Sequence, residues 1–199
     1  MTLVTTRTVA ILAFDDMEVL DFAGPYEVFN VAGELGEDSP FSVFSVGLTT
    51  APAVGRGGFT VTPTYALDDA PLFDVLVIPG GAGTRPLLRD ERLLAWIRER
   101  GAEVELLLSV CTGALLLGAA GLLDGLSATT HHDAFDELAT LSPTTTVVRG
   151  QRFVRSSERL VTSAGVSAGV DASLYVVQSL TDQRTHDRTV TEMEWMWQS

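Results

Sequence analysis

The chain contains 199 residues, of which 46% are hydrophobic and 20% charged, a composition typical of a globular protein with one sizeable core. Its formal net charge of −13 repels phosphate backbones, which makes nucleic acid a poor partner. A single cysteine excludes an internal disulfide framework and fits a reducing cytoplasm.

The N-terminus and the apolar runs argue against export and membrane insertion. The opening stretch, MTLVTTRTVAILAF, has an apolar run that is too short for a signal peptide and lacks a plausible cleavage site. No run approaches the roughly 18 to 20 apolar residues of a membrane span. We therefore expect a cytoplasmic protein without a membrane partner. We expect one domain over residues 1–199, of which 1–7 form a leading tail.

Short apolar runs alternate with helix-length segments along the chain. Strands are predicted at residues 8–14, 41–46, 73–78, 106–110 and 127–130, and near 147–148, 153–154 and 160–161. Helices are predicted at 18–32, 91–100, 114–120, 132–138, 167–180 and 183–197, and a loop with an edge hairpin at 51–62. This alternation predicts an α/β fold, namely a flavodoxin-like, doubly wound, mostly parallel sheet with helices on both faces. The last helix ends in MEWMWQS, whose large apolar side chains are expected in the core or at a dimer contact.

Cys111 lies where the predicted strand 106–110 changes into the helix 114–120. Such a turn places the side chain at the carboxyl edge of the sheet, facing the first N–H groups of the helix. The positive end of the helix dipole would stabilise a thiolate there, as in a nucleophile elbow with cysteine in place of serine. The alternative is an inert, buried cysteine that serves as a small hydrophobe.

Two carboxylates, Glu18 and Asp21, follow the first predicted strand and share one helix face. They lie at the sheet edge that carries the ligand crevice in open α/β folds. A carboxyl beside a thiolate in an apolar site should have a raised pKa, which would make it a proton donor at neutral pH. The alternative is that each is an ordinary charge at a helix N-terminus.

The remaining candidates are two glycines and three histidines. Gly80 and Gly81 directly follow the strand 73–78 and either aim backbone N–H groups at a ligand or form a plain turn. His131 ends a strand and is a candidate base or a hydrogen-bonded residue of the pocket wall. His186 is predicted to be solvated. We expect no metal site, because the neighbours His132 and Asp133 should point to different faces and no further ligands follow at zinc spacing.

Four stretches together resemble the ThiJ/PfpI superfamily, within it the isocyanide hydratase branch and the related sensor domains of AraC-type regulators. They read FDDMEVLDFAGPYEVF, DVLVIPGGAG, SVCTGALLLGAAGLLDGLSATTHHD and TSAGVSAGVDASL, in this order along the chain. The cysteine elbow and the IPGG loop are specific to the superfamily, and LDFAGP with CTG points less specifically to the hydratase branch. The second histidine, His132, and the late SAGVSAG loop depart from the hydratase pattern and put the substrate in doubt.

The resemblance implies a role for each site position. It makes Cys111 the nucleophile and Asp21 the acid/base carboxylate, with Glu18 as the runner-up. Thr112 would supply a hydroxyl and a backbone N–H at the site, and Gly80 and Gly81 would offer N–H groups opposite the sulfur.

The expected function is therefore cofactor-free hydration of a small-molecule isocyanide to an N-substituted formamide, in a homodimer. The rivals are glyoxalase, deglycase or amidase chemistry and a non-catalytic thiol sensor of redox stress. A peptidase is disfavoured because Thr112 follows the cysteine where peptidase members carry histidine. The acidic charge, and an end at Ser199 directly after the domain, speak against a complete DNA-binding regulator.

Overall fold

The computed structural model describes residues 6–35 and 40–197. Its centre is a sheet of seven strands in the order β10-β11-β7-β6-β1-β2-β5, in which β10 is antiparallel to its neighbour and the other pairs are parallel. The strands are β1 (Arg7–Ala13), β2 (Phe41–Gly47), β5 (Tyr65–Ala66), β6 (Val75–Ile78), β7 (Leu106–Val110), β10 (Phe153–Arg155) and β11 (Leu160–Ser163). The predicted doubly wound, mostly parallel sheet is confirmed.

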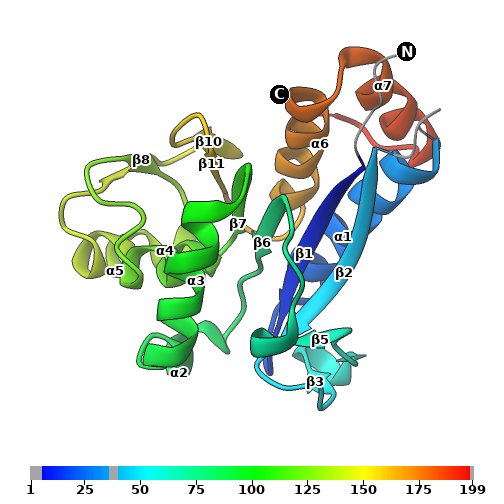
Figure 1. The fold of residues 1–199 in the computed structure, drawn as a ribbon. Coiled ribbons are helices and arrows are strands. Elements are labelled where there is room, and N and C mark those ends of the chain that lie inside the picture. Colours follow the sequence, from blue (N-terminus) through cyan, green and yellow to red (C-terminus); the bar gives the residue numbers. More distant parts are fainter. Residues whose placement is uncertain (1–5, 36–39, 198–199) are drawn as a thin grey trace.

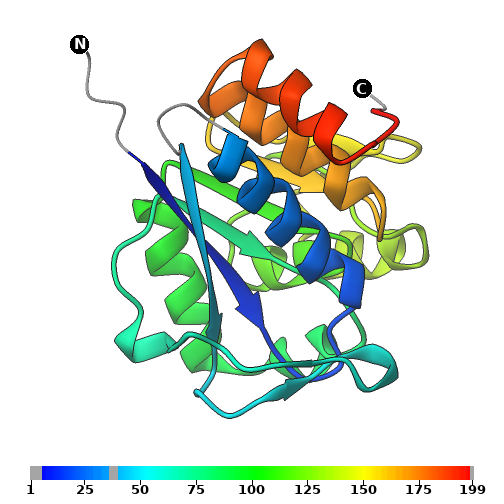
Figure 2. The ribbon, with the colours of Figure 1, turned by 90° about the vertical axis from the view of Figure 1, so that its right-hand side faces the viewer.

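Helices cover both faces of this sheet. One layer consists of α1 (Val19–Leu35), α6 (Ala168–Leu180) and α7 (Gln183–Glu192), which pack against one another, and Figure 2 shows them in front of the strands. The opposite layer contains α2 (Thr84–Leu87), α3 (Glu91–Glu103), α4 (Gly113–Ala119) and α5 (Phe135–Leu141), on the left in Figure 1. The strands between the layers are buried on both sides, which explains why β1, β6 and β7 are mostly apolar in the sequence.

Smaller elements lie outside the main sheet. The predicted edge hairpin is confirmed as the antiparallel pair β3 (Ala53–Val54) and β4 (Thr60–Val61). The short strands β8 (Ser127–Ala128) and β9 (Thr146–Val147) form a separate parallel pair. In the part of the chain that the structure describes, 3-10 turns lie at Arg56–Gly58, Leu67–Asp69 and His132–Ala134. The strand expected near 147–148 therefore does not belong to the main sheet, and that at 127–130 is shorter than predicted.

The C-terminal segment differs from its prediction as one long helix. α7 ends at Glu192, and Glu194 adopts a positive φ of 48°, which ends the helical path. The chain then turns back, so that Trp195 Nε1 donates a hydrogen bond of 2.8 Å to Asp171 Oδ1 in α6. Trp195 and Trp197 pack against the core, which was one of the two places expected for them. Met196, in contrast, is 84% exposed.

His186 is buried, which makes its prediction as a solvated residue wrong. Only 4% of it is exposed, because α7 turns this side toward the core and the ring of Trp197 packs edge-on against the imidazole. Its Nδ1 atom lies 2.9 Å from Asp187 Oδ1. His186 thus belongs to the helical layer and not to a site at the sheet edge.

The ends of the chain add two observations. Residues 1–5 of the predicted leading tail lie outside the described residues, and Arg7 already belongs to β1. None of the helices in the described part of the chain combines the length and apolar character needed to cross a membrane.

Candidate active site

The predicted elbow at Cys111 is present between β7 and α4. Cys111 has a φ of 56°, a left-handed conformation that costs a non-glycine residue about 1–3 kcal/mol. Its N–H points to the carbonyls of Ser163 (3.1 Å), the last residue of β11, and of Ala164 (3.3 Å), which follows the strand. The turn is tight because a Cβ on Gly113 would lie only 2.1 Å from the carbonyl oxygen of Ile78. The side chain is 6% exposed.

Asp21 meets Cys111 from the first turn of α1. The carboxyl is fully buried and is in hydrogen-bonding contact with the Cys111 thiol. One oxygen, Oδ2, accepts from the N–H of Gly80 (3.2 Å), and the other, Oδ1, accepts from the N–H of Val166 (3.1 Å). Four segments that are far apart in the sequence therefore converge on this thiol and carboxyl.

The two groups hold their protons more tightly than free side chains do. Burial raises the pKa of Asp21 from 3.8 to about 7, although the thiol and the two backbone N–H groups oppose the shift. Burial, and then the negative charge of Asp21, raise the pKa of Cys111 from 9.0 to about 12. The raised carboxyl pKa agrees with expectation. The expected low-pKa thiolate is wrong, because burial outweighs the backbone N–H and hydroxyl of Thr112.

Thr112 and the two glycines fix the loop between β6 and α2 to the elbow. The Thr112 hydroxyl accepts from the N–H of Gly81 (2.8 Å) and lies 3.1 Å from the Gly81 carbonyl, to which it donates. Gly81 has a φ of 129°, and a Cβ there would lie 2.4 Å from the Glu18 nitrogen. The N–H of Gly80 is bound to Asp21. Both glycine N–H groups are therefore engaged within the site, and their predicted role as N–H groups opposite the sulfur stays a prediction.

Glu18 lies just before α1 and does not replace Asp21 at the sulfur. Its carboxylate pairs with Arg56 at 2.7 Å, and the arginine side chain is 76% exposed. The charge of Glu18 contributes to the raised pKa of Asp21. Of the two predicted carboxylates, the structure thus brings Asp21 to Cys111 and leaves Glu18 as a neighbouring negative charge.

His131 lies beside the turn after β11. A Cβ on Gly165 would lie 2.3 Å from His131 Cδ2, which shows how closely the ring packs against this turn. Burial and then His132 lower its pKa, so that the imidazole is neutral at pH 7. Its two interpretations, as a base and as a hydrogen-bonded residue of the pocket wall, stay predictions. Arg85 also affects this pKa and approaches the loop, with Nη1 3.3 Å from the Gly81 carbonyl.

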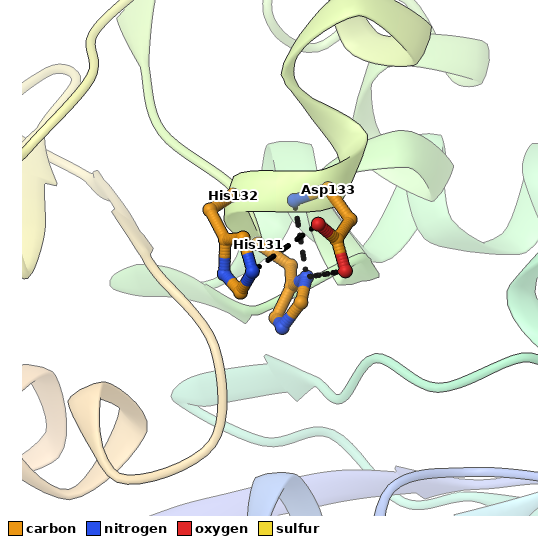
Figure 3. A group of neighbouring side chains, drawn as sticks. All are labelled: His131, His132 and Asp133. Atoms are coloured by element: carbon orange, nitrogen blue, oxygen red, sulfur yellow. Dashed lines mark hydrogen bonds and ion pairs between the residues drawn. The ribbon is translucent and has the colours of Figure 1, made fainter.

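His131, His132 and Asp133 gather at the start of the 3-10 turn (Figure 3). One ligand atom from each lies within 4.8 Å of the others, so the expectation that these neighbours diverge is wrong. His131 Nδ1 already accepts from the N–H of Asp133 (3.3 Å), and about three quarters of the His132 and Asp133 side chains is exposed. The group is thus an exposed polar cluster joined by its own contacts.

Sequence reasoning did not find the contribution of Val166. This residue lies in the glycine-flanked turn 165–169 and has a φ of 54°, which is unusual for a β-branched side chain. Its N–H reaches Asp21 from a position 145 residues away in the chain. The glycines at 165 and 169 mark the turn in the sequence, but nothing there indicates which N–H points to the carboxyl.

Comparisons with known proteins agree with this geometry. The model of the DJ-1/PfpI family matches residues 7–179. The chain is 36% identical to an isonitrile hydratase of Pseudomonas putida over 187 residues, which cover 94% of this chain and 78% of the hydratase. A crystal structure of a ThiJ/PfpI family protein from Pseudomonas syringae superposes with a TM-score of 0.87 at 31% identity, over 99% of this chain and 78% of that one.

A more distant relative is named as a regulator and not as an enzyme. The HTH-type transcriptional regulator GbdR of Pseudomonas aeruginosa is 23% identical over 86% of this chain, and the match spans 46% of the regulator. From the matching family model, the relative from Pseudomonas putida and the shared fold, we conclude that this chain belongs to the DJ-1/PfpI family.

Proposed function

We propose that this protein adds water to an isocyanide, R–N≡C, and releases an N-substituted formamide. The observation that carries the proposal is the buried Cys111–Asp21 pair, in which a nucleophile and an exchangeable proton are in contact. The relative from Pseudomonas putida, an isonitrile hydratase, supports the substrate class. We expect the reaction to need no metal or organic cofactor.

In the first half-reaction, Asp21 moves a proton from sulfur to carbon. The ionised carboxylate takes the proton of Cys111 as the sulfur attacks the terminal carbon of the isocyanide. The new S–C bond leaves an electron pair on that carbon, and Asp21 returns the proton to it. The product is a thioimidate, R–N=CH–S–Cys111. A carboxyl with a pKa of about 7 suits both transfers, because it gains and loses its proton near neutral pH.

In the second half-reaction, water adds to the thioimidate carbon. Asp21 accepts a proton from the attacking water and passes it to the imidate nitrogen, which becomes N–H. The tetrahedral intermediate R–NH–CH(OH)–S–Cys111 then collapses. Its hydroxyl forms the formamide C=O, the C–S bond breaks, and the proton returns to sulfur. The net reaction is R–N≡C plus water to R–NH–CHO, with Cys111 and Asp21 regenerated.

A turnover assay with a simple alkyl isocyanide tests this function. We expect the wild-type protein to form the N-substituted formamide, and Cys111→Ala to form none. Asp21→Asn should lower turnover by at least about a hundredfold, because both proton transfers are lost. Ser109→Ala is the matched control: Ser109 lies on β7 close to the elbow, and its buried hydroxyl has no hydrogen-bond partner among the described residues.

A different result would identify the rival chemistry. If the wild-type protein forms no formamide but consumes methylglyoxal through Cys111, the hydratase proposal is wrong and a glyoxalase or deglycase activity replaces it. A thiol sensor is less favoured, because the raised pKa of Cys111 leaves little of the thiolate that peroxide oxidises. The homodimer, the single domain over residues 1–199 and the cytoplasmic location stay predictions.

A further inference from the structure

The turn 164–167 contacts both members of the Cys111–Asp21 pair. The Ala164 carbonyl lies 3.3 Å from the Cys111 nitrogen, and the N–H of Val166 donates to Asp21 Oδ1 at 3.1 Å. Between them, Gly165 packs against the ring of His131. The position of this short turn therefore determines whether Asp21 receives its second backbone hydrogen bond.

This turn is not in a relaxed conformation. Val166 has a φ of 54°, and a β-branched residue in the left-handed region costs about 1–3 kcal/mol relative to an extended one. Such a conformation persists only when surrounding contacts hold it. Relaxation of the turn would rotate the Val166 N–H away from the carboxylate.

Arg152 holds the turn at both ends. Its carbonyl accepts from the N–H of Ala164 (2.8 Å), and its Nη2 atom donates to Ser167 Oγ (3.4 Å). The same guanidinium donates through Nε to Asp171, a fully buried carboxylate on α6. Asp171 in turn accepts from Trp195 Nε1 (2.8 Å), so that the segment after α7 is joined to the same network.

We propose that Arg152 is a positioning residue for the active site, which holds the turn 164–167 in the conformation where the Val166 N–H reaches Asp21. The inference rests on the proposed function only in so far as Asp21 serves as the acid/base group. Arg152 itself acts through the turn and contacts no reacting atom.

The groups around Asp21 allow the effect of Arg152 on this carboxyl to be distinguished from the effects of the other neighbours. The groups that affect the carboxyl are the Cys111 thiol, the N–H of Gly80, the charge of Glu18 and the N–H of Val166. Of these, only Val166 lies in the turn that Arg152 holds. Loss of that one donor removes an interaction with the ionised form, so that Asp21 should bind its proton more tightly.

The variant Arg152→Lys tests the proposal without changing the net charge. A lysine ammonium cannot span Asp171 and Ser167 as the planar guanidinium does. The readout is the rate at which iodoacetamide alkylates Cys111, the only cysteine of the chain, as a function of pH. In the wild-type protein this rate should rise with a midpoint near pH 7, because the ionised Asp21 carboxylate takes the thiol proton as the sulfur attacks iodoacetamide. In Arg152→Lys we expect the midpoint to move up by about half a unit to one pH unit.

Two further variants complete the design. Arg149→Lys is the control, because Arg149 forms an exposed ion pair with Asp136 and should leave the midpoint unchanged. Trp195→Phe removes only the indole donor to Asp171 and should move the midpoint in the same direction by a smaller amount; it also keeps the test decisive if Arg152→Lys fails to fold. An unchanged midpoint in the folded variants, with a lowered melting temperature, overturns the proposal and leaves the network a structural one. Alkylation needs no isocyanide, so a protein that shows the shift but forms no formamide refutes the proposed function alone.

Discussion

The proton on Asp21 decides how the pair works, and its affinity predicts a pH profile. With an Asp21 pKa of about 7 and a Cys111 pKa of about 12, the form above pH 7 is a thiol beside a carboxylate. That carboxylate is the base in the first step, so kcat/KM for an isocyanide should rise as the pH increases through about 7 and then level off. Steady-state rates between pH 5 and 9 measure this. A rate that falls through pH 7 would instead identify the protonated carboxyl as the active form.

Thr112 carries a second prediction at the residue scale. Its hydroxyl is the partner of both the N–H and the carbonyl of Gly81. Thr112→Val keeps the shape but removes the acceptor of the Gly81 N–H, whereas the Gly81 carbonyl keeps the Thr84 hydroxyl at 2.9 Å; the free energy of unfolding should fall by about 1 kcal/mol. Thr112→Ser retains the hydroxyl and serves as the control in urea denaturation. Equal stability of the two variants would show that the hydroxyl does not hold the loop.

Part of the site could be predicted from residues alone. Around Cys111 the spacing of apolar residues changes from a strand pattern to a helix pattern, and Asp21 follows the first strand. Both observations place these residues at one sheet edge, where the structure brings them into contact. The protonation of the pair could not be predicted. It depends on burial and on N–H groups of Gly80 and Val166, which lie 59 and 145 residues from Asp21 in the sequence.

At the scale of elements, α4 offers a matched pair of glycines. A Cβ on Gly113 would lie 2.1 Å from the Ile78 carbonyl oxygen, whereas one on Gly118 would lie 3.4 Å from the nearest atoms, side-chain carbons of Leu138 and Ser142. Gly113→Ala should therefore push α4 off β6 and destabilise the fold by about 1–3 kcal/mol or more. Gly118→Ala should be neutral or stabilise the helix by up to about 1 kcal/mol.

Denaturant unfolding of the two alanine variants measures this difference. Both substitutions add the same methyl group to the same helix, so helix propensity alone predicts equal effects. If Gly113→Ala is as stable as Gly118→Ala, the close approach of the elbow to β6 does not constrain the site.

The elements that could be predicted are the long ones with a clear period. β1, β2, β7, α1, α3 and α6 agree with expectation to within a few residues, because burial on both faces or on one helix face gives a strong pattern. α2 and β5 were missed, since four and two residues are too short to show a period. The early end of α7 follows from a tertiary contact, the hydrogen bond of Trp195 to Asp171, which no local pattern contains.

At the scale of the whole molecule, the site is a consequence of sheet topology. Cys111 follows β7, Gly80 follows β6, Asp21 follows β1 and Val166 follows β11, all strands that run parallel. Parallel strands bring the segments after their carboxyl ends to one edge, which explains why residues so distant in sequence surround one thiol. The fold thereby places a carboxyl where it cannot be solvated.

This burial links the site to the stability of the molecule. A carboxyl whose pKa rises from 3.8 unfolded to about 7 folded binds more protons in the folded state. Its contribution is therefore fully favourable only below about pH 4 and is lost as the pH rises toward and through 7. As the pH rises from 5 to 8, the ionisation of Asp21 should lower the free energy of unfolding by roughly 2–3 kcal/mol. Asp21→Asn, which cannot ionise, should lack this loss.

Urea denaturation of both proteins at pH 5 and pH 8 isolates the effect. The relevant quantity is the change with pH of the difference between Asp21→Asn and wild type, because the loss of one N–H acceptor adds only a constant offset. Asp187→Asn is the control, because the pKa of Asp187 is shifted in the opposite direction to that of Asp21. Contacts with His186 and Gln183 lower it, so that Asp187 titrates below this pH window. If the difference for Asp21→Asn does not change from pH 5 to pH 8, Asp21 is already ionised in the folded protein at pH 5, and the expected rise of kcat/KM through pH 7 is then wrong.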